Sequence, residues 1–196
     1  MNDDPDPRME RAGDLAGEPD GFQRLWTPHR MAYIGGQSKP ADGAAGDGCP
    51  FCRAASGPDA QGLVIGRGAL TYALLNLYPY NSGHVLVCPY RHVADYTDLT
   101  PDEVAELGTT TRIAMRALRA THAPQGFNIG LNLGDVAGAG IAAHLHQHLV
   151  PRWRGDANFL PIVARTRALP EILADTRARV AAAWGRAAHD EGGAAC

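Results

Sequence analysis

The sequence contains no long apolar run. None of its hydrophobic stretches approaches the roughly 20 residues that a membrane-spanning helix needs. The N-terminus also lacks the basic segment followed by an apolar one that marks a secretory signal. We therefore expect a soluble, cytoplasmic protein that has no membrane partner.

Cysteine is scarce, with four in 196 residues. Cys49 and Cys52 form a close pair, Cys88 lies in an apolar run, and Cys196 ends the chain. This spacing makes a poor disulfide framework, which agrees with a reducing compartment. In such a compartment a Cys-x-x-Cys pair indicates metal binding or redox chemistry.

Basic residues form no stripe, so the composition gives no reason to expect a nucleic-acid partner. The net charge is −3, but seven acids and only two arginines fall within residues 1–20. An acidic start with almost no large apolar residues predicts a disordered or loosely docked tail there. We expect the folded domain over residues 21–185 and a flexible tail over 186–196.

The remaining sequence alternates short apolar segments with turns and holds no internal repeat. Thr100, Pro101 and Glu103 form the pattern of a capping box, which predicts a helix to about Thr121. Strands joined by short turns, with one long helix between them, predict an α+β domain around an antiparallel sheet. The predicted strands cover residues 63–65, 70–75, 84–88 and 127–132, and a second helix covers 170–183.

Three histidines stand at every second position between Gly140 and Pro151. Since a β-strand sends alternate side chains to one face, a strand here would place His144, His146 and His148 in a row. Imidazole titrates near neutrality, so such a row indicates nucleophilic, proton-transfer or metal chemistry. The alternative is a polar strand with incidental histidines.

Spacing argues against one zinc ion held by all three histidines. Along a strand, His144 and His148 are about 13 Å apart at their backbones, whereas zinc needs its ligand nitrogens about 2.0–2.1 Å away. A nucleophilic His146 attacking phosphorus tolerates the spacing. Its other ring nitrogen then needs a hydrogen-bond acceptor, such as a backbone carbonyl. The preceding loop, Gly134–Gly140, would supply amide donors for phosphoryl oxygens.

The segment His144-Leu-His-Gln-His-Leu-Val150 resembles the signature of the histidine triad superfamily, whose members hydrolyse or transfer nucleoside monophosphates. The resemblance covers roughly residues 49–153. The flanking segments look like the bacterial branch similar to diadenosine tetraphosphate phosphorylases. The resemblance implies a histidine triad fold, in which flanking helices cover a five-stranded antiparallel sheet, and a homodimer.

The resemblance also implies roles for individual residues. His146 would take the nucleoside monophosphate, His148 would contact the phosphate, and His84 would support the cluster. Gln147 departs from the family pattern, which prefers an apolar residue there. Candidates for contacts with ribose and phosphate are Asn76, Asn132, Gly138, Ala139, Gly140, Ile141 and Trp153. Read without the family, Asn76 is a turn residue, His84 an edge residue and Trp153 a packing residue.

Zinc-containing histidine triad proteins and the related hexose-phosphate uridylyltransferases imply a structural zinc site made of Cys49, Cys52, His92 and His144. Two cysteines and two histidines suit a closed zinc site, although a lone Cys-x-x-Cys pair is often empty. Thioredoxin-like use would need a strand before the motif, and residues 43–48 offer none. If His144 binds zinc, it cannot also contact substrate. No organic cofactor is expected.

These patterns together predict an enzyme that cleaves diadenosine tetraphosphate through a nucleotidyl-His146 intermediate. Inorganic phosphate or water would then accept the nucleotide. One rival is a nucleoside phosphoramidate hydrolase or nucleotidyl transferase that uses the same residues. A rival of another class is a nucleotide-binding module with little turnover.

Overall fold

The computed structural model describes residues 9–11, 23–25, 45–156 and 171–193. The chain divides into two units, Met1–Ser38 and Lys39–Cys196. In the first unit, β1 (Met9–Arg11) pairs with β2 (Gln23–Leu25) in an antiparallel two-stranded sheet. Apart from β1, the predicted acidic tail over residues 1–20 lies outside the described residues.

The second unit is built on a five-stranded sheet in the order β3-β4-β5-β7-β6, and every neighbouring pair is antiparallel. The predicted α+β class is therefore confirmed. Pro89, which we expected to follow a strand, is instead the last residue of β5 and pairs with Thr71. The bounds are β3 (Val64–Arg67), β4 (Thr71–Leu75), β5 (Val85–Pro89), β6 (Gly126–Leu131) and β7 (Gln147–Arg152).

The long helix α3 (Pro101–His122) begins and ends nearly where the sequence predicts. The side chain of Thr100 accepts from the Glu103 amide, and the Glu103 carboxylate accepts from the Thr100 amide, so both bonds of the capping box are present. Helix α5 (Leu173–Gly193) continues well past its predicted end at residue 183, into the segment where we expected a flexible tail. No helix in the described part of the chain is long and apolar enough to cross a lipid bilayer.

Three shorter helical elements have no counterpart in the prediction. The first two adjoin the cysteine pair, and Cys49 caps the second of them, so the Cys-x-x-Cys motif opens a helix that the sequence reading missed. The elements are η2 (Gly46–Gly48), α2 (Pro50–Ser56) and η3 (Tyr96–Asp98).

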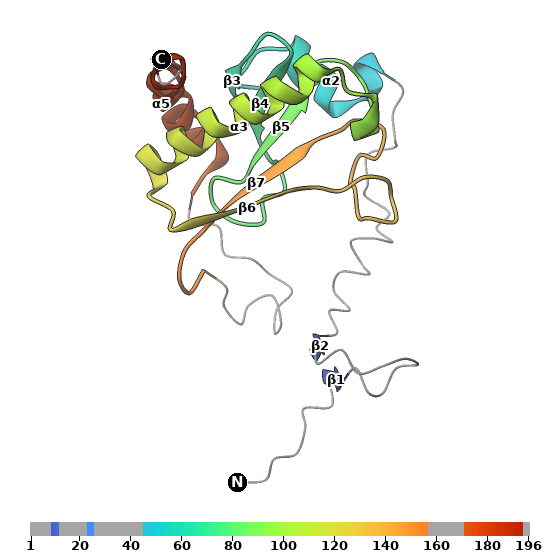
Figure 1. Ribbon diagram of the computed structural model, residues 1–196. Helices are drawn as coiled ribbons and strands as arrows, with labels where there is room; N and C mark the ends of the chain where they lie inside the picture. The colour runs from blue at the N-terminus through green and yellow to red at the C-terminus, as the bar shows by residue number, and fades with distance from the viewer. Residues whose placement is uncertain (1–8, 12–22, 26–44, 157–170, 194–196) are drawn as a thin grey trace. The chain divides into compact units, whose positions relative to one another are not determined.

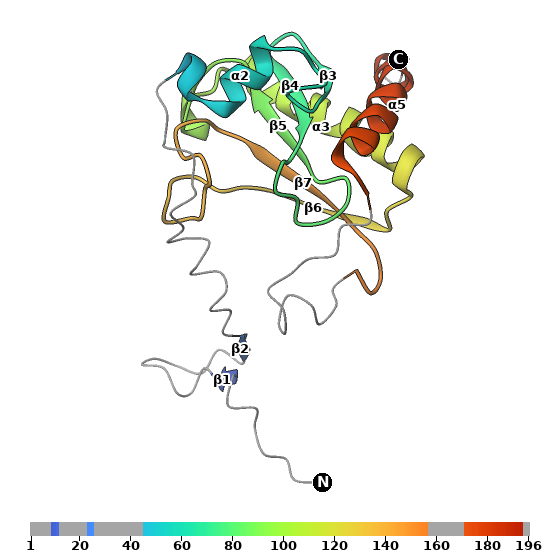
Figure 2. The ribbon, with the colours of Figure 1, turned by 180° about the vertical axis from the view of Figure 1, so that it is seen from behind.

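The two faces of the sheet carry separate cores, because side chains alternate along each strand. Figure 1 shows α3 across one face, and Figure 2 shows α2 on the other. On the α3 face, Ala73 and Val87 join the core that α3 and α5 cover. On the α2 face, Tyr72 and Leu86 pack with Phe51 of α2. This second, smaller core also includes Ile141, which lies in the segment between β6 and β7.

Helix α5 packs closely against the edge strand β3. Trp184 lies where a side chain at Gly66 would be, since a Cβ at Gly66 would come within 2.0 Å of the indole. The pairing of β3 with β4 shifts its register between Val64 and Gly66. A residue without a side chain is therefore required at this close approach.

Polar side chains join α3 to the sheet. The Gln147 side chain donates to the Thr111 hydroxyl at 2.7 Å, and the Thr110 and Thr71 hydroxyls are 2.7 Å apart. The run Thr109-Thr110-Thr111 interrupts the apolar face of this helix. In the structure Thr110 and Thr111 are buried and supply the polar partners of the sheet.

The predicted strand through all three histidines is wrong in its first half. Strand β7 begins only at Gln147, so His144 and His146 precede it. The reason is non-local: the amide of Leu145 donates to the Val93 carbonyl at 2.7 Å instead of joining the sheet ladder. A turn over residues 141–144 redirects the side chain of His144.

Candidate active site

Three of the four predicted catalytic histidines gather on the α2 face of the sheet. The rings of His146 and His148 have centroids 5.1 Å apart, and those of His84 and His148 are 5.2 Å apart. His148 lies in β7 opposite Leu86, while His84 directly precedes β5. His146 and His84 are buried, and His148 is half-buried.

The hydrogen bond of His146 determines which ring nitrogen is a nucleophile. Its Nδ1 lies 2.9 Å from the carbonyl oxygen of His144. A carbonyl only accepts, so Nδ1 carries the proton and Nε2 keeps a free lone pair. The acceptor that the mechanism requires is therefore the backbone of the neighbouring triad residue, which the sequence alone did not name.

A chain of hydrogen bonds assigns the protons of His84 and His148. The backbone amide of Tyr80 donates to Nδ1 of His84 at 3.0 Å, so the proton of His84 is on Nε2. That Nε2 lies 3.0 Å from Nδ1 of His148, which must accept. His148 consequently carries its proton on Nε2, a buried atom with no hydrogen-bond partner among the described residues. An N–H donor on the ring next to His146 is suited to a phosphoryl oxygen or a leaving oxygen.

Burial keeps the imidazoles of His146 and His148 neutral. It lowers the pKa of His148 to about 4, with a smaller contribution from the neighbouring His146. Burial also lowers the pKa of His146, and its bond to the His144 carbonyl opposes that shift. A nucleophile must be unprotonated and the neighbouring donor needs only one proton, so the neutral forms are the ones that suit nucleotidyl transfer.

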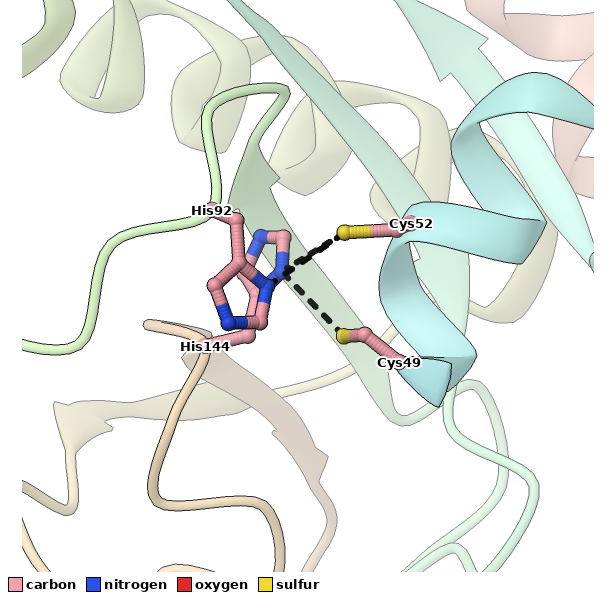
Figure 3. A group of neighbouring side chains, drawn as sticks. All are labelled: Cys49, Cys52, His92 and His144. Carbon is pink, nitrogen blue, oxygen red and sulfur yellow. Dashed lines mark hydrogen bonds between the residues drawn. The ribbon is translucent and has the colours of Figure 1, made fainter. Parts of the chain in front are cut away.

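His144 belongs to a different group of side chains. Figure 3 shows it facing Cys49 and Cys52, the two ends of the Cys-x-x-Cys motif at the start of α2, together with His92 from the loop after β5. The ligand atoms of all four residues lie within 4.8 Å of one another. The four residues that the resemblance implied for a metal site are thus brought together.

The spacing of these atoms suits a tetrahedral metal ion. Nδ1 of His144 is 3.4 Å from Sγ of Cys49 and 3.6 Å from Sγ of Cys52, and Nδ1 of His92 is 3.4 Å from Sγ of Cys52. Metal–ligand distances of about 2.0–2.3 Å put tetrahedral ligands about 3.3–3.8 Å apart. Nε2 of His144 donates to the Pro89 carbonyl at 3.0 Å, which leaves Nδ1 free as a ligand.

Asn76 makes the contacts of a turn residue and also touches the cluster. Its side-chain oxygen accepts from the Tyr78 amide at 3.0 Å, and its side-chain nitrogen is 3.3 Å from Nδ1 of His84. The expected contact between Asn76 and ribose stays a prediction.

The glycine loop after β6 forms as predicted, but it uses some of its own amides. The Gly138 amide donates to the Asp135 carbonyl at 2.8 Å, and the Ala139 amide to the Gly134 carbonyl at 3.3 Å. Within the part of the chain that the structure describes, the amides of Gly140 and Ile141 have no such acceptor. The half-buried Asn132 follows Leu131, whose register partner is Gln147, so it lies at the level of His146.

Trp153 is not brought to the histidines. Its indole N–H donates to the His122 carbonyl at the end of α3, at 3.3 Å. It stands five residues beyond His148 along the direction of β7, or about 16 Å away. This is the packing role that we gave as the alternative.

Two aromatic residues of the site were absent from the prediction. The Phe51 ring lies 4.9 Å from the His146 ring, and the Tyr80 ring stacks on His148 at 5.6 Å with an interplanar angle of 14°. Their only sequence signal is proximity to recognised motifs, since Phe51 is inside the Cys-x-x-Cys pair and Tyr80 is near His84.

Comparisons with known proteins agree with this geometry. A model of the HIT domain matches residues 58–155. The AP-4-A phosphorylase of Mycobacterium tuberculosis is 48% identical over 172 residues, covering 87% of this chain and 88% of that protein. The asymmetrical bis(5'-nucleosyl)-tetraphosphatase of Schizosaccharomyces pombe is 38% identical over 93 residues, covering 47% of this chain and 50% of that protein. A solved zinc-bound histidine triad family protein from Mycobacterium smegmatis has a TM-score of 0.56 at 28% identity, covering 70% of this chain and 94% of that one.

A five-stranded antiparallel sheet that brings His84, His146 and His148 together is the arrangement expected of a histidine triad protein. The chain belongs to the HIT domain family. The resemblance inferred from the histidine segment is thereby confirmed.

Proposed function

We propose that this protein cleaves dinucleoside polyphosphates, with diadenosine tetraphosphate as the first substrate to test and His146 as the nucleophile. The observation that carries the proposal is the protonation of two neighbouring imidazoles, whose ring centroids are 5.1 Å apart. Nε2 of His146 keeps its lone pair, and the N–H of Nε2 on His148 has no hydrogen-bond partner among the described residues. The 48% identity to a protein named AP-4-A phosphorylase supports the choice of substrate.

In the first step, Nε2 of His146 attacks the α-phosphorus of one adenylate. A nitrogen–phosphorus bond forms, and the bond from that phosphorus to the bridging oxygen breaks. ATP leaves, and the adenylate remains on His146 as a phosphoramidate. The N–H of His148 stabilises the negative charge that develops on the phosphoryl and leaving oxygens.

In the second step, an acceptor oxygen displaces His146 from the phosphorus. If inorganic phosphate is the acceptor, ADP is released and the overall reaction is phosphorolysis. If water is the acceptor, AMP is released and the overall reaction is hydrolysis. In both cases His146 regains its lone pair on Nε2, and its Nδ1–H stays on the His144 carbonyl.

Product analysis tests this proposal directly. We expect diadenosine tetraphosphate incubated with the protein and inorganic phosphate to give ADP and ATP. AMP and ATP would instead assign the hydrolase alternative. Turnover of an adenosine phosphoramidate but not of diadenosine tetraphosphate would assign the phosphoramidate hydrolase. Nucleotide binding without products in any of these assays would overturn the proposal in favour of a binding module.

We further propose that the metal held by Cys49, Cys52, His92 and His144 is zinc, because two thiolates and two imidazoles in tetrahedral array are its preferred donors. The zinc-bound relative from Mycobacterium smegmatis supports this choice. The ion would supply structural stability, since all four positions of a tetrahedron are taken by protein side chains. Elemental analysis of protein purified without chelator tests it.

The homodimer stays a prediction from the resemblance, and the cytoplasmic location stays a prediction from the composition of the sequence. Light scattering coupled to gel filtration tests the first, and a dimer mass is the expected result. A monomer mass at micromolar concentration would contradict it. Fractionation of the source cells tests the second.

A further inference from the structure

Four aromatic rings form a continuous row through the site. The Phe51 and His146 rings are 4.9 Å apart, His146 and His148 are 5.1 Å apart, and His148 and Tyr80 are 5.6 Å apart. In this row the imidazoles of His146 and His148 therefore lie between the rings of Phe51 and Tyr80. The Phe51 ring, at 7% exposure, is the buried one.

The place of Phe51 is determined by the metal ligands on both sides of it. Cys49 precedes it by two residues and Cys52 follows it, and the segment between them is the first turn of α2. A metal ion that binds both thiolates would fix this turn and hence the direction of the phenyl ring. Phe51 also packs edge-on against His144, at 5.4 Å and 66°.

A second connection joins the same cluster to the nucleophile. The side chain of His144 offers one of the four ligand atoms, while its backbone carbonyl accepts the Nδ1–H of His146. The cluster thus reaches His146 through two different contacts, a ring contact from Phe51 and a hydrogen bond from His144. Both contacts act on the imidazole of His146. The Phe51 ring limits the rotation of this imidazole, and the hydrogen bond to the His144 carbonyl selects its tautomer.

We propose that Phe51 is a positioning residue for His146 and that the metal cluster, acting through Phe51 and the His144 carbonyl, holds the nucleophile in the Nδ1–H tautomer with Nε2 free. The inference rests on the proposed role of His146 as nucleophile. Phe51 contacts the imidazole ring of His146. It acts by keeping the imidazole in line with the phosphorus, where a displacement of 1 Å costs about 100-fold in rate.

The test compares Phe51→Leu with Phe127→Leu. Phe127 is a half-buried phenylalanine of β6 that packs against the core on the α3 face, so its replacement removes a ring of the same size away from the site. Zinc content is measured for both variants. Nitrogen-15 NMR of labelled histidine, at one fixed pH, reports the tautomer of His146. Single-turnover kinetics reports the rate of adenylate transfer to His146.

We expect Phe51→Leu to retain zinc, to lose the single Nδ1–H tautomer of His146, and to transfer adenylate about 10-fold to 100-fold more slowly. Phe127→Leu should match the wild type in zinc content, in the tautomer of His146 and in the rate of adenylate transfer. Should Phe51→Leu fail to fold or to hold zinc, Phe51→Met, which keeps apolar bulk without a ring, takes its place. A zinc-loaded Phe51 variant with the wild-type tautomer and rate would overturn the inference.

Removal of zinc from the wild-type protein gives an independent readout. Chelation should broaden or shift the His146 signals towards mixed tautomers, and added zinc should restore them. Signals that stay unchanged on chelation would contradict the coupling. The NMR readout needs no substrate, so it separates the two proposals. A wild-type protein that never forms an adenylated histidine would refute the proposed function. The response of the His146 tautomer to chelation would still test the positioning of His146.

Discussion

At the scale of single residues, the positions of the protons on His84, His146 and His148 follow from three hydrogen bonds. Two of them come from backbone groups, the His144 carbonyl and the Tyr80 amide, which cannot change their donor or acceptor character. Together with the bond between His84 and His148, they leave Nε2 of His146 as an acceptor and make Nε2 of the neighbouring His148 a donor. The roles that the resemblance assigned to these two residues thus have a physical basis in backbone geometry.

The lowered pKa values predict an unusual pH dependence. A histidine with a lowered pKa stays neutral as the pH falls through the usual histidine value near 6.5. His148 becomes protonated only near its own pKa of about 4. Burial also lowers the pKa of the nucleophile, His146. We therefore expect the rate of adenylate transfer to His146, measured in a single turnover, to fall with a midpoint below pH 6.5.

The control for this experiment is folding. Unfolded histidines bind protons near pH 6.5 whereas the buried ones do not, so the free energy of unfolding decreases as the pH falls below that value. Intrinsic fluorescence at each pH shows whether the protein is folded. A rate that halves near pH 6.5 in folded protein would contradict the assignment of neutral, buried histidines.

His84 and His148 are predicted to act as one unit. His148→Ala removes the donor and should slow adenylate transfer by about 10²–10⁴-fold. His84→Ala removes the group that holds His148 in its tautomer and should slow transfer less. The double variant should be no slower than His148→Ala alone, because the second change removes a support that no longer has a function. Independent effects that multiply in the double variant would argue against the relay.

At the scale of secondary-structure elements, the departure at Gln147 is matched by a threonine on α3. The Gln147 side chain donates to the Thr111 hydroxyl, which in turn donates to the Leu107 carbonyl at 2.7 Å. A polar residue where the family pattern prefers an apolar one is thus compatible with burial against this helix. The contact holds the start of β7, between His146 and His148, against α3.

A double-mutant cycle tests this contact. Thr111→Val leaves the Gln147 amide without its acceptor and should lower the free energy of unfolding by about 1 kcal/mol or more. Combining it with Gln147→Leu should recover part of that loss, with a coupling energy of about 0.5–3 kcal/mol. Urea unfolding of the four proteins provides the measurement. Purely additive losses would show that the hydrogen bond contributes nothing to stability.

Local signals in the sequence were enough for some elements and not for others. Helix α3 was predicted nearly to its ends, because Thr100 and Glu103 cap it within a single turn. Helix α2 was missed, because seven residues that begin at a cysteine pair carry little helical signal of their own. The histidine segment was predicted as one strand because alternation is the only local signal it offers.

The remainder of the site depends on contacts between distant parts of the chain. The Val93 carbonyl holds Leu145 away from the sheet, and the Pro89 carbonyl orients His144 towards the cysteines. Family resemblance supplied the four candidate metal ligands and the three histidines of the triad, since their identities are written in short motifs. It did not supply Phe51, whose contact with His146 arises only when α2 docks on the sheet.

At the scale of the whole molecule, the cluster of candidate metal ligands joins three separate segments of the second unit. Cys49 and Cys52 come from the start of α2, His92 from the loop after β5, and His144 from the turn before β7. An ion that binds only the folded arrangement adds its binding free energy to stability.

Metal removal should therefore destabilise the protein. Zinc at 100 times its Kd would contribute about 2.7 kcal/mol to the free energy of unfolding. Chelation, or Cys52→Ser, should remove that contribution in urea unfolding experiments. Cys88→Ala is the matched control, because Cys88 is a buried cysteine outside the cluster and its loss should lower stability without lowering zinc content. Equal stability with and without zinc would contradict a structural role.

The most direct test of the account is to trap the covalent intermediate. Protein mixed with diadenosine tetraphosphate labelled at the α-phosphorus is quenched in alkali within the first turnover, digested and analysed by mass spectrometry. We predict an adenylate on the peptide that contains His146, absent in His146→Ala and lost when inorganic phosphate is added before the quench. Wild-type turnover by His146→Ala, or label on any other residue, would contradict the account.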